Sequence, residues 1–219
     1  MDTDDTKSAP RSSRPPAPVD CKVRERLLTS AARLFARKGY AATTVREIVA
    51  EAGVTKPVLY YYFRSKEGIY SELLQEALKR FEALLEEARQ RRGRAVERLL
   101  FLTDRVLALF LDQIEVARLA YSVYYGPPQG TPDFDLDAYH LKFQARLTEL
   151  VREGFDSREF RRGTVEDVTW LVLAVLNMAL ELQLSHPEMG FGREDLRRIL
   201  KLMVAGLQGP AIAERKDCL

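Results

Sequence analysis

The sequence of 219 residues contains only two cysteines, two histidines and one tryptophan. Cys21 and Cys218 lie near opposite ends of the chain in no metal-ligand spacing, so we interpret them as unpaired thiols in a reducing compartment. His140 and His186 have no serine, cysteine or metal-ligand partner at a recognisable spacing, and no glycine-rich phosphate loop is present. We therefore expect no catalytic site, no metal and no cofactor.

Long apolar runs are also missing. The stretch from Val165 to Leu184 is apolar nearly all round, but polar residues interrupt it, and its longest unbroken run is Trp170 to Leu176. A membrane-spanning helix needs about 20 apolar residues, so a span is disfavoured. Met1 to Asp20 contains no apolar run either, so we expect no secretory signal peptide and a cytoplasmic protein.

The formal net charge of +2 is small, but the charge is unevenly distributed. Between Asp20 and Lys66 there are ten basic residues and four acidic ones, and the rest of the chain is acidic overall. A basic segment on a mildly acidic body is typical of a protein that contacts DNA with one end.

A short helix, a tight turn and a second short helix are predicted within this basic segment. Thr44 can cap the first helix with its hydroxyl, and Glu47 three residues later completes a capping box. Gly53 follows the apolar face of this helix, where a residue with positive φ ends it. Thr55 and Pro57 suit the cap and the first turn of the next helix. This order indicates a helix-turn-helix, whose second helix enters the major groove of DNA.

The same stretch resembles the helix-turn-helix of the TetR family of bacterial transcriptional regulators. The family pattern T-x-x-x-I-A-x-x-A-G-V-S-x-x-x-L-Y-x-H-F-x-x-K-E-x-L is matched in register, within a resemblance that covers about residues 24 to 75. The matching positions are Thr44, Ile48, Ala52, Gly53, Val54, Thr55, Leu59, Tyr60, Phe63, Lys66 and Glu67. Tyr62 stands where the family most often has histidine, and Val49 where it often has alanine. The resemblance implies a dimeric DNA-binding protein with a separate helical body that binds a small molecule, but no particular ligand.

Helical periodicity continues through the chain, without a strand pattern or an internal repeat. We predict an all-α protein of about nine helices, with a three-helix head and a C-terminal bundle. The predicted parts are a disordered tail (1–20), the head (21–66), a ligand-binding and dimerisation body (67–210) and a C-terminal tail (211–219). Arg11 and Arg14 in the first tail either reach a minor groove or stay solvated.

The predicted helices outside the helix-turn-helix are bounded by glycines, prolines and polar segments. They cover Lys22 to Lys38, Lys66 to about residue 90, Arg94 to Tyr125 in two helices that meet near Asp112, Leu136 to Glu153, Val165 to Leu184 and Arg193 to Leu207. The helix that starts at Lys66 is long enough to link the head to the body.

Candidate DNA contacts follow from residue chemistry and from the resemblance. Helix N-termini favour phosphate, phenols donate hydrogen bonds to phosphate, and lysine can reach a guanine edge or a phosphate. The candidates are Thr44, Thr55, Lys56, Pro57, Tyr60, Tyr61, Tyr62 and Lys66. Three consecutive tyrosines point about 100° apart on a helix, so at least one of them should face outward.

Candidate effector contacts come from aromatic residues of the predicted body and from its few polar groups. The aromatic candidates are Phe101, Phe110, Tyr121, Tyr124, Tyr125, Phe143 and Trp170, and the polar ones are His140, Asn177 and Glu181. Aromatic residues at helical spacing are more often core than pocket, although phenols need bonded or wet partners, which a cavity supplies. Asn177 and Glu181 lie four residues apart and face either a pocket or the dimer interface.

The stretch from Val165 to Leu184 is either a buried core helix or part of a dimer interface. In the resembling family, the last two long helices of each subunit pack against their twins in a four-helix interface, which favours the second alternative. The predicted interface residues are Leu173, Leu176, Leu180, Leu184, Ile199, Leu202 and Met203.

The sequence thus predicts a regulator that binds a palindromic operator as a homodimer, most simply a repressor released by a small hydrophobic or aromatic ligand. Activation, or permanent repression without a ligand, stays open as an alternative. The alternatives are an architectural DNA-binding protein without an effector and an enzyme that uses the aromatic pocket, with His140 as its only acid or base at neutral pH.

Overall fold

The structure is a computed structural model that describes residues 21–125 and 130–209. Within these residues it contains nine α-helices, one short 3-10 turn and no strand, which confirms the predicted all-α class. The helices are α1 (Cys21–Lys38), α2 (Val45–Ala52), α3 (Lys56–Phe63), α4 (Lys66–Gln90), α5 (Ala95–Asp112), α6 (Ile114–Tyr125), α7 (Leu136–Asp156), α8 (Val165–Ser185) and α9 (Arg193–Gln208). The two tails, including Arg11 and Arg14, lie outside the described residues.

The helix ends agree closely with the predicted ones, because glycines, prolines and capping residues mark them. The predicted meeting of two helices near Asp112 is the junction of α5 and α6, which are separated by Gln113 alone. α7 continues three residues beyond its predicted end at Glu153. The short turn η1 (Pro187–Met189), between α8 and α9, was not predicted.

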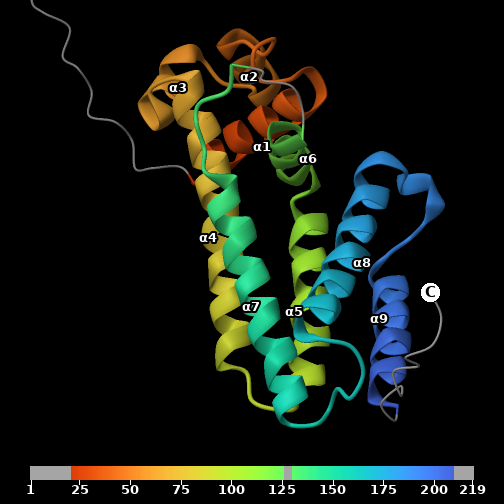
Figure 1. The fold of residues 1–219 in the computed structure, drawn as a ribbon. Helices are drawn as coiled ribbons and strands as arrows, with labels where there is room; N and C mark the ends of the chain where they lie inside the picture. The colour runs from red at the N-terminus through yellow and green to blue at the C-terminus, as the bar shows by residue number, and fades with distance from the viewer. Residues whose placement is uncertain (1–20, 126–129, 210–219) are drawn as a thin grey trace, which may run out of the picture.

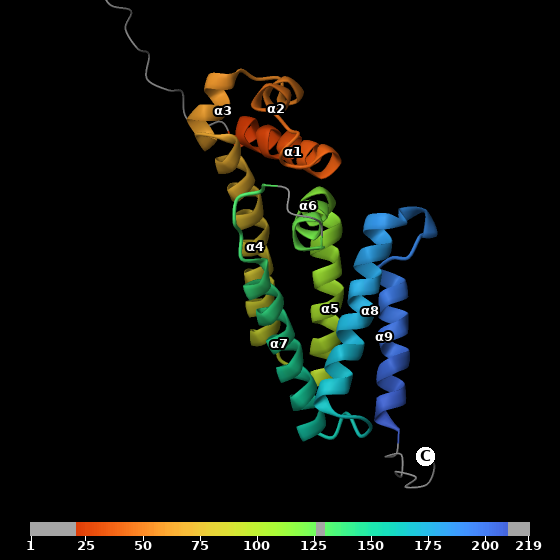
Figure 2. The same cartoon turned by 45° about the horizontal axis from the view of Figure 1, so that its top comes forward.

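The buried side chains form two hydrophobic cores, one in the head at the top of Figure 1 and one in the body below it. The head core joins α1, α2 and α3 to the first turns of α4, and it also contains Leu119 of α6, which is only 1 % exposed. α6 packs against α1 and lies under it in both views (Figures 1 and 2). The division at residue 66 stays a prediction, but the head core reaches beyond it into α4 and α6.

The long helix α4 connects the two cores. Its 25 residues span about 37 Å at 1.5 Å per residue, from the head to the far end of the body (Figure 1). Tyr70 and Leu74 are buried in the head core, whereas Leu84 and Ala88 are buried in the body core. α4 is therefore one continuous helix that contributes buried side chains to both cores.

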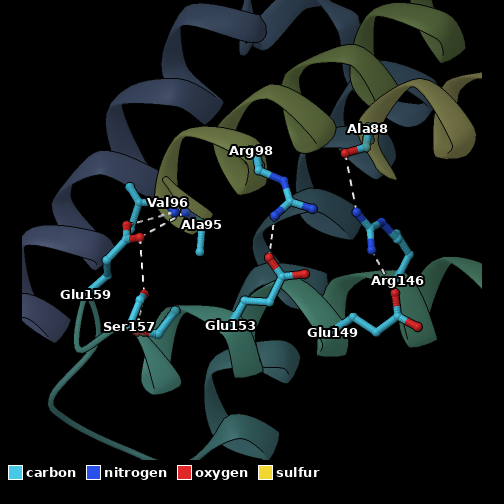
Figure 3. Close-up of polar contacts among 10 residues, drawn as sticks. Ala88, Ala95, Val96, Arg98, Arg146, Glu149, Glu153, Ser157 and Glu159 are labelled. Carbon is cyan, nitrogen blue, oxygen red and sulfur yellow. Dashed lines mark hydrogen bonds and ion pairs between the residues drawn. The ribbon is translucent and has the colours of Figure 1, made fainter. Parts of the chain in front are cut away.

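The end of the body farthest from the head is fixed by polar contacts (Figure 3). Glu159 accepts hydrogen bonds from the backbone N–H groups of Ala95 (2.9 Å) and Val96 (3.1 Å), so it caps α5 from the α7–α8 connection. Burial works to raise the pKa of Glu159, but these two bonds, together with the Ser157 hydroxyl and the charge of Arg94, outweigh it and hold the pKa below its ordinary value.

Two arginines add to this brace between helices. The buried Arg146 of α7 donates to the backbone carbonyl of Ala88 at the end of α4 (3.3 Å), and Arg98 of α5 pairs with Glu153 of α7 (Figure 3). Both contacts join helices that are far apart in sequence. They hold the turn between α4 and α5 against α7.

Candidate nucleic-acid interface and effector cavity

α2 begins with the predicted capping box. The backbone N–H of Glu47 donates to the Thr44 hydroxyl (3.3 Å), and the backbone N–H of Thr44 donates to the Glu47 carboxylate (2.9 Å). Glu47 also pairs with Lys38 of α1. The Lys38 bond and then the Thr44 backbone bond lower the pKa of Glu47 from 4.5 to about 2. Gly53 ends α2 in the left-handed region, with a φ of 64°, as predicted.

The N-terminal end of α3 presents the polar groups expected of a recognition helix. Thr55, Lys56 and Pro57 are all exposed there. Thr55 is the N-cap residue of α3, as predicted, and has the extended backbone of that position, but its hydroxyl makes no capping bond. The Thr55 hydroxyl is therefore not committed to the helix end, and together with Lys56 it forms a polar tip on α3.

The next turn of α3 separates an inner face from an outer one. Leu59 and Phe63 are buried in the head core, while Tyr60 and Tyr61 are 47 % and 53 % exposed. Tyr62 is partly buried, and its ring meets the Tyr61 ring edge-on at 5.1 Å. At least one of the three tyrosines was expected to face outward, and both Tyr60 and Tyr61 do.

Lys66 is placed differently from the other predicted DNA contacts. Its ammonium donates to the backbone carbonyls of Tyr40 (3.0 Å) and Thr43 (3.1 Å), in the connection between α1 and α2, and it lies 4.1 Å from the centre of the Tyr40 ring. These contacts direct the side chain into the head. Lys66 thus ties the start of α4 to α1 and α2, and its ammonium is not part of the exposed surface around α3.

A cavity of about 200 Å³ lies in the body, among α4, α5, α6, α7 and α8. Seven of the predicted effector contacts line it: Phe110, Tyr121, Tyr124, Tyr125, His140, Phe143 and Asn177. The sequence therefore located most of the aromatic wall, because these residues lie on helices that converge on one space.

Three of the predicted effector contacts lie elsewhere. The guanidinium of Arg91 covers the Phe101 ring at 4.2 Å, and Trp170 is 53 % exposed on the outer face of α8. Glu181 is exposed outside the cavity, although its charge acts on Tyr121. Burial and then this charge raise the pKa of Tyr121.

Several lining residues were not predicted as effector contacts. They are Leu74, Ala77, Leu78, Phe81, Val106, Leu109, Gln113, Val116, Ala117, Ala120, Leu136, Tyr139, Leu176 and Leu180. The apolar period of α4 indicates only a link between head and body. The aromatic Phe81 of α4 could also have indicated that this helix lines the cavity. Gln113 was missed because a single polar residue between two helices resembles an ordinary connection.

The cavity wall is apolar, and its polar groups are few. Among the described lining residues none is an aspartate, glutamate, lysine or arginine. Two lining residues, Tyr125 and Asn177, are also exposed, and the ring centres of Tyr124 and His140 lie 6.1 Å apart in a stacked arrangement. Across residues 21–125 and 130–209, no group of three or more His, Cys, Asp or Glu side chains is placed to hold a metal ion.

The structure revises the predicted dimer residues. Leu173 and Leu176 are only 2 % and 1 % exposed, because they are buried in the protomer's own core, where no partner can contact them. Leu180 lines the cavity, and Leu184, Ile199 and Met203 are half-buried. Of the predicted interface residues, Leu202 of α9 is the most exposed, at 69 %, so a partner subunit can contact it.

α8 and α9 pack side by side (Figure 2), and both carry large exposed apolar side chains. We call their outer side the α8–α9 face. Its large apolar members are Trp170, Leu171 and Met178 on α8 and Leu202 on α9, where charged side chains surround Leu202. By length and composition α8 could cross a membrane, and only 33 % of its most apolar window is buried in the protomer. The exposure is one-sided, however, because Val172 is fully buried. One buried side and one exposed apolar side suit a helix that meets a partner subunit.

The fold and the geometry of the head define a helix-turn-helix DNA-binding protein with a helical body that encloses a cavity. Residues 27–73 match the model of the bacterial regulatory proteins of the tetR family. The chain is also 30 % identical over 183 residues to the transcriptional repressor KstR2 of Mycolicibacterium smegmatis, which covers 76 % of this chain and 80 % of that protein. The chain belongs to the tetR family and is a DNA-binding transcriptional regulator.

Two further relatives show how the similarity is distributed. The transcriptional regulator YerO of Bacillus subtilis is 48 % identical over 46 residues, but these are only 21 % of this chain and 16 % of that protein. The crystal structure of the TetR family regulator PfmR from Thermus thermophilus superposes on this chain with a TM-score of 0.67 and 27 % sequence identity. The match covers 83 % of this chain and 98 % of PfmR. The fold is therefore shared along nearly the whole of PfmR, whereas the match to YerO is short and local.

Proposed function

We propose that the protein is a repressor that binds a palindromic operator as a homodimer and is released by a small apolar effector. The observation that carries this proposal is a helix shared by the cavity and the head. On α6, Ala117, Ala120 and Tyr121 line the cavity, while Leu119 is buried in the head core against α1. Occupation of the cavity therefore acts on a helix that supports the DNA-binding head. The relative KstR2 is a transcriptional repressor, which supports repression as the sign of regulation.

The DNA-contacting surface is proposed to consist of Thr44 at the start of α2 and the exposed side of α3. Lys56 and the Thr55 hydroxyl would face base edges or phosphates, and Tyr60 and Tyr61 would donate to phosphates. Lys66 would contribute by fixing the geometry of the head, since its ammonium is bonded to Tyr40 and Thr43.

Release would follow from a preference of the effector for a conformation that does not fit the operator. The ligand displaces α6 and α4, which both carry residues of the head core, and this changes the spacing of the two recognition helices. To convert a mostly bound population into a mostly free one, the effector must favour the released form by about 5 kcal/mol.

The dimer is proposed to form through the α8–α9 face. This surface contains large apolar side chains that a partner can bury, and a two-fold interface between α8–α9 pairs places two heads on one side of the dimer. A protein that keeps this face covered stays soluble, and we infer that it acts in the cytoplasm, where its operator lies.

The proposal is tested by measuring the binding of the purified protein to DNA fragments from around its own gene at two salt concentrations. We expect tight binding to one palindrome that weakens steeply with salt. The double variant Lys56→Ala, Tyr60→Ala should lose about a hundredfold in affinity, because it removes one groove contact and one phosphate contact. Lys79→Ala, which removes the same charge from the exposed side of α4, is the matched control and should bind like the wild type.

Weak binding without sequence preference, equal in the wild type and the double variant, would refute the repressor proposal. Tight binding that no apolar compound weakens would refute the effector part alone. The first result would mean that the head does not recognise a sequence, and the second that the protein is a regulator without an apolar ligand.

A further inference from the structure

The cavity contains a polar group that the apolar wall does not explain. Gln113 lines the cavity at the junction between α5 and α6, and its side-chain amide nitrogen is enclosed and has no hydrogen-bond partner among the described residues. Its backbone groups are used, since its N–H donates to Phe110 (3.3 Å) and its carbonyl accepts from Ala117 (2.9 Å). The side chain is therefore held at the cavity wall with an unused donor.

An enclosed amide nitrogen without a partner is unfavourable, by about 1 to 3 kcal/mol for a typical buried polar group. No described residue accepts a hydrogen bond from this nitrogen, and most side chains of the cavity wall are apolar. Polar groups in apolar pockets orient a ligand. A donor without a partner on a residue of this wall is suited to orient a ligand.

We propose that Gln113 donates a hydrogen bond to an acceptor oxygen of the effector, and that the effector is a neutral, mainly apolar molecule with such an oxygen at one end. We expect a neutral ligand because the described lining residues include no aspartate, glutamate, lysine or arginine that could pair with an ammonium or a carboxylate. This inference rests on the proposed effector function of the cavity and adds the ligand class and the residue that reads it.

The position of Gln113 gives this hydrogen bond a second consequence. Gln113 alone separates α5 from α6, and α6 carries Leu119 into the head core. A ligand oxygen that accepts a hydrogen bond from Gln113 is therefore bound at the connection between α5 and α6, where the angle between the two helices can change. The polar end of the ligand lies at the site where a small shift reaches α1 most directly.

The test compares two probes that differ by one acceptor, butyrophenone and butylbenzene, by calorimetric binding to the full-length protein. The wild type should bind the ketone about fivefold more tightly, the value of one net hydrogen bond. Gln113→Met keeps the side-chain length but removes the donor, so the preference should disappear while the affinity for butylbenzene is retained. Gln75→Met, on the exposed surface of α4, is the matched control and should keep the fivefold preference.

The folding of each variant is checked by its thermal midpoint. Gln113→Met should unfold no earlier than the wild type, because it removes a buried group without a partner. A ketone preference that survives in Gln113→Met, or that is lost in Asn177→Leu instead, overturns the proposal, because the oxygen would then be read elsewhere.

A wild type that binds both probes equally, or neither, also overturns the assignment of Gln113. Operator binding is measured separately in the same preparation, so it shows whether the repressor proposal fails as well. Tight, salt-sensitive operator binding that apolar compounds weaken, without any ketone preference, refutes this inference and leaves the repressor proposal standing.

Discussion

At the scale of single residues, the sharpest constraint on the head is Gly68 in the first turn of α4. A Cβ atom at this position would lie 1.9 Å from the backbone oxygen of Phe63, the last residue of α3. Alanine usually stabilises a helix relative to glycine, by about 1 kcal/mol, but here the clash is with a backbone atom that cannot rotate away. Because Gly68 has no Cβ atom, the first turn of α4 can pack closely against the end of α3.

We predict that Gly68→Ala destabilises the protein by about 2 to 3 kcal/mol, as overpacking typically does, and weakens operator binding by displacing α3. The free energy of unfolding is measured by urea denaturation and DNA affinity by titration. Gly192→Ala is the control, because no atom lies within 4 Å of its Cβ position, and it should cost less than about 1 kcal/mol. Equal losses in the two variants would show that the contact with Phe63 does not constrain the junction.

Single side chains also mark where sequence reasoning stops. Lys66 matches the family pattern and was assigned to DNA, but its ammonium bonds to the carbonyls of Tyr40 and Thr43. Nothing local encodes this contact, because the two carbonyls lie more than 20 residues earlier in the chain and are presented only once α1 and α2 are packed. Gln113 resembles an ordinary connection in the sequence, and its place in the cavity wall depends on residues of several other helices.

At the scale of helices, the cap of α2 links stability to pH. The pKa of Glu47 falls from 4.5 to about 2 on folding, first through Lys38 and then through the Thr44 backbone bond. A lowered folded-state pKa means that the unfolded chain binds a proton more readily. The stabilisation from Glu47 is therefore complete above pH 4.5 and is lost progressively as the pH falls towards 2.

We predict that the wild type is more stable than Glu47→Gln near neutral pH and that this difference shrinks as the pH falls below 4.5. The urea midpoints of both proteins, measured between about pH 6 and pH 3, provide the comparison. Lys38→Met removes the first cause of the shift and should reduce the pH dependence of the difference. A difference that stays constant over this range would contradict the role assigned to the Glu47 carboxylate.

Helix ends could be predicted from the sequence because their signals are local. Thr44 with Glu47, and Gly53, marked the two ends of α2, and the structure contains both features. The faces of α8 could not be predicted in the same way. This helix is apolar nearly all round, so its period does not show that Leu173 and Leu176 point into the core while Trp170 and Met178 point out. The direction of each face depends on how α8 crosses its neighbours, which no short pattern specifies.

At the scale of the whole molecule, the position of the α8–α9 face is set within the protomer. Asp104 of α5 accepts hydrogen bonds from Arg193 (2.6 Å) and Arg197 (3.1 Å) of α9. Burial works to raise the pKa of Asp104, but the arginines outweigh it and keep the pKa below its ordinary value. α9 is thus held to the body by its inner side and by this ion-pair group. A change on its outer side should leave the protomer folded and affect only what docks there.

We predict that Leu202→Glu converts the dimer into a monomer with an unchanged helical content. Leu202 is 69 % exposed in the protomer, so the substitution harms no internal packing, but in the proposed dimer it buries a carboxylate from each subunit at the interface. Because a palindrome is read by two linked heads, its affinity should fall by at least about a hundredfold, the usual scale of lost bivalency. Leu141→Glu, at a 61 % exposed leucine of α7, is the matched control and should stay dimeric.

Sedimentation analysis measures the oligomeric state of each variant, and operator titration measures its DNA affinity. A dimeric Leu202→Glu with wild-type operator affinity would move the interface away from α9, whereas a monomer that still binds the palindrome tightly would separate dimerisation from DNA recognition.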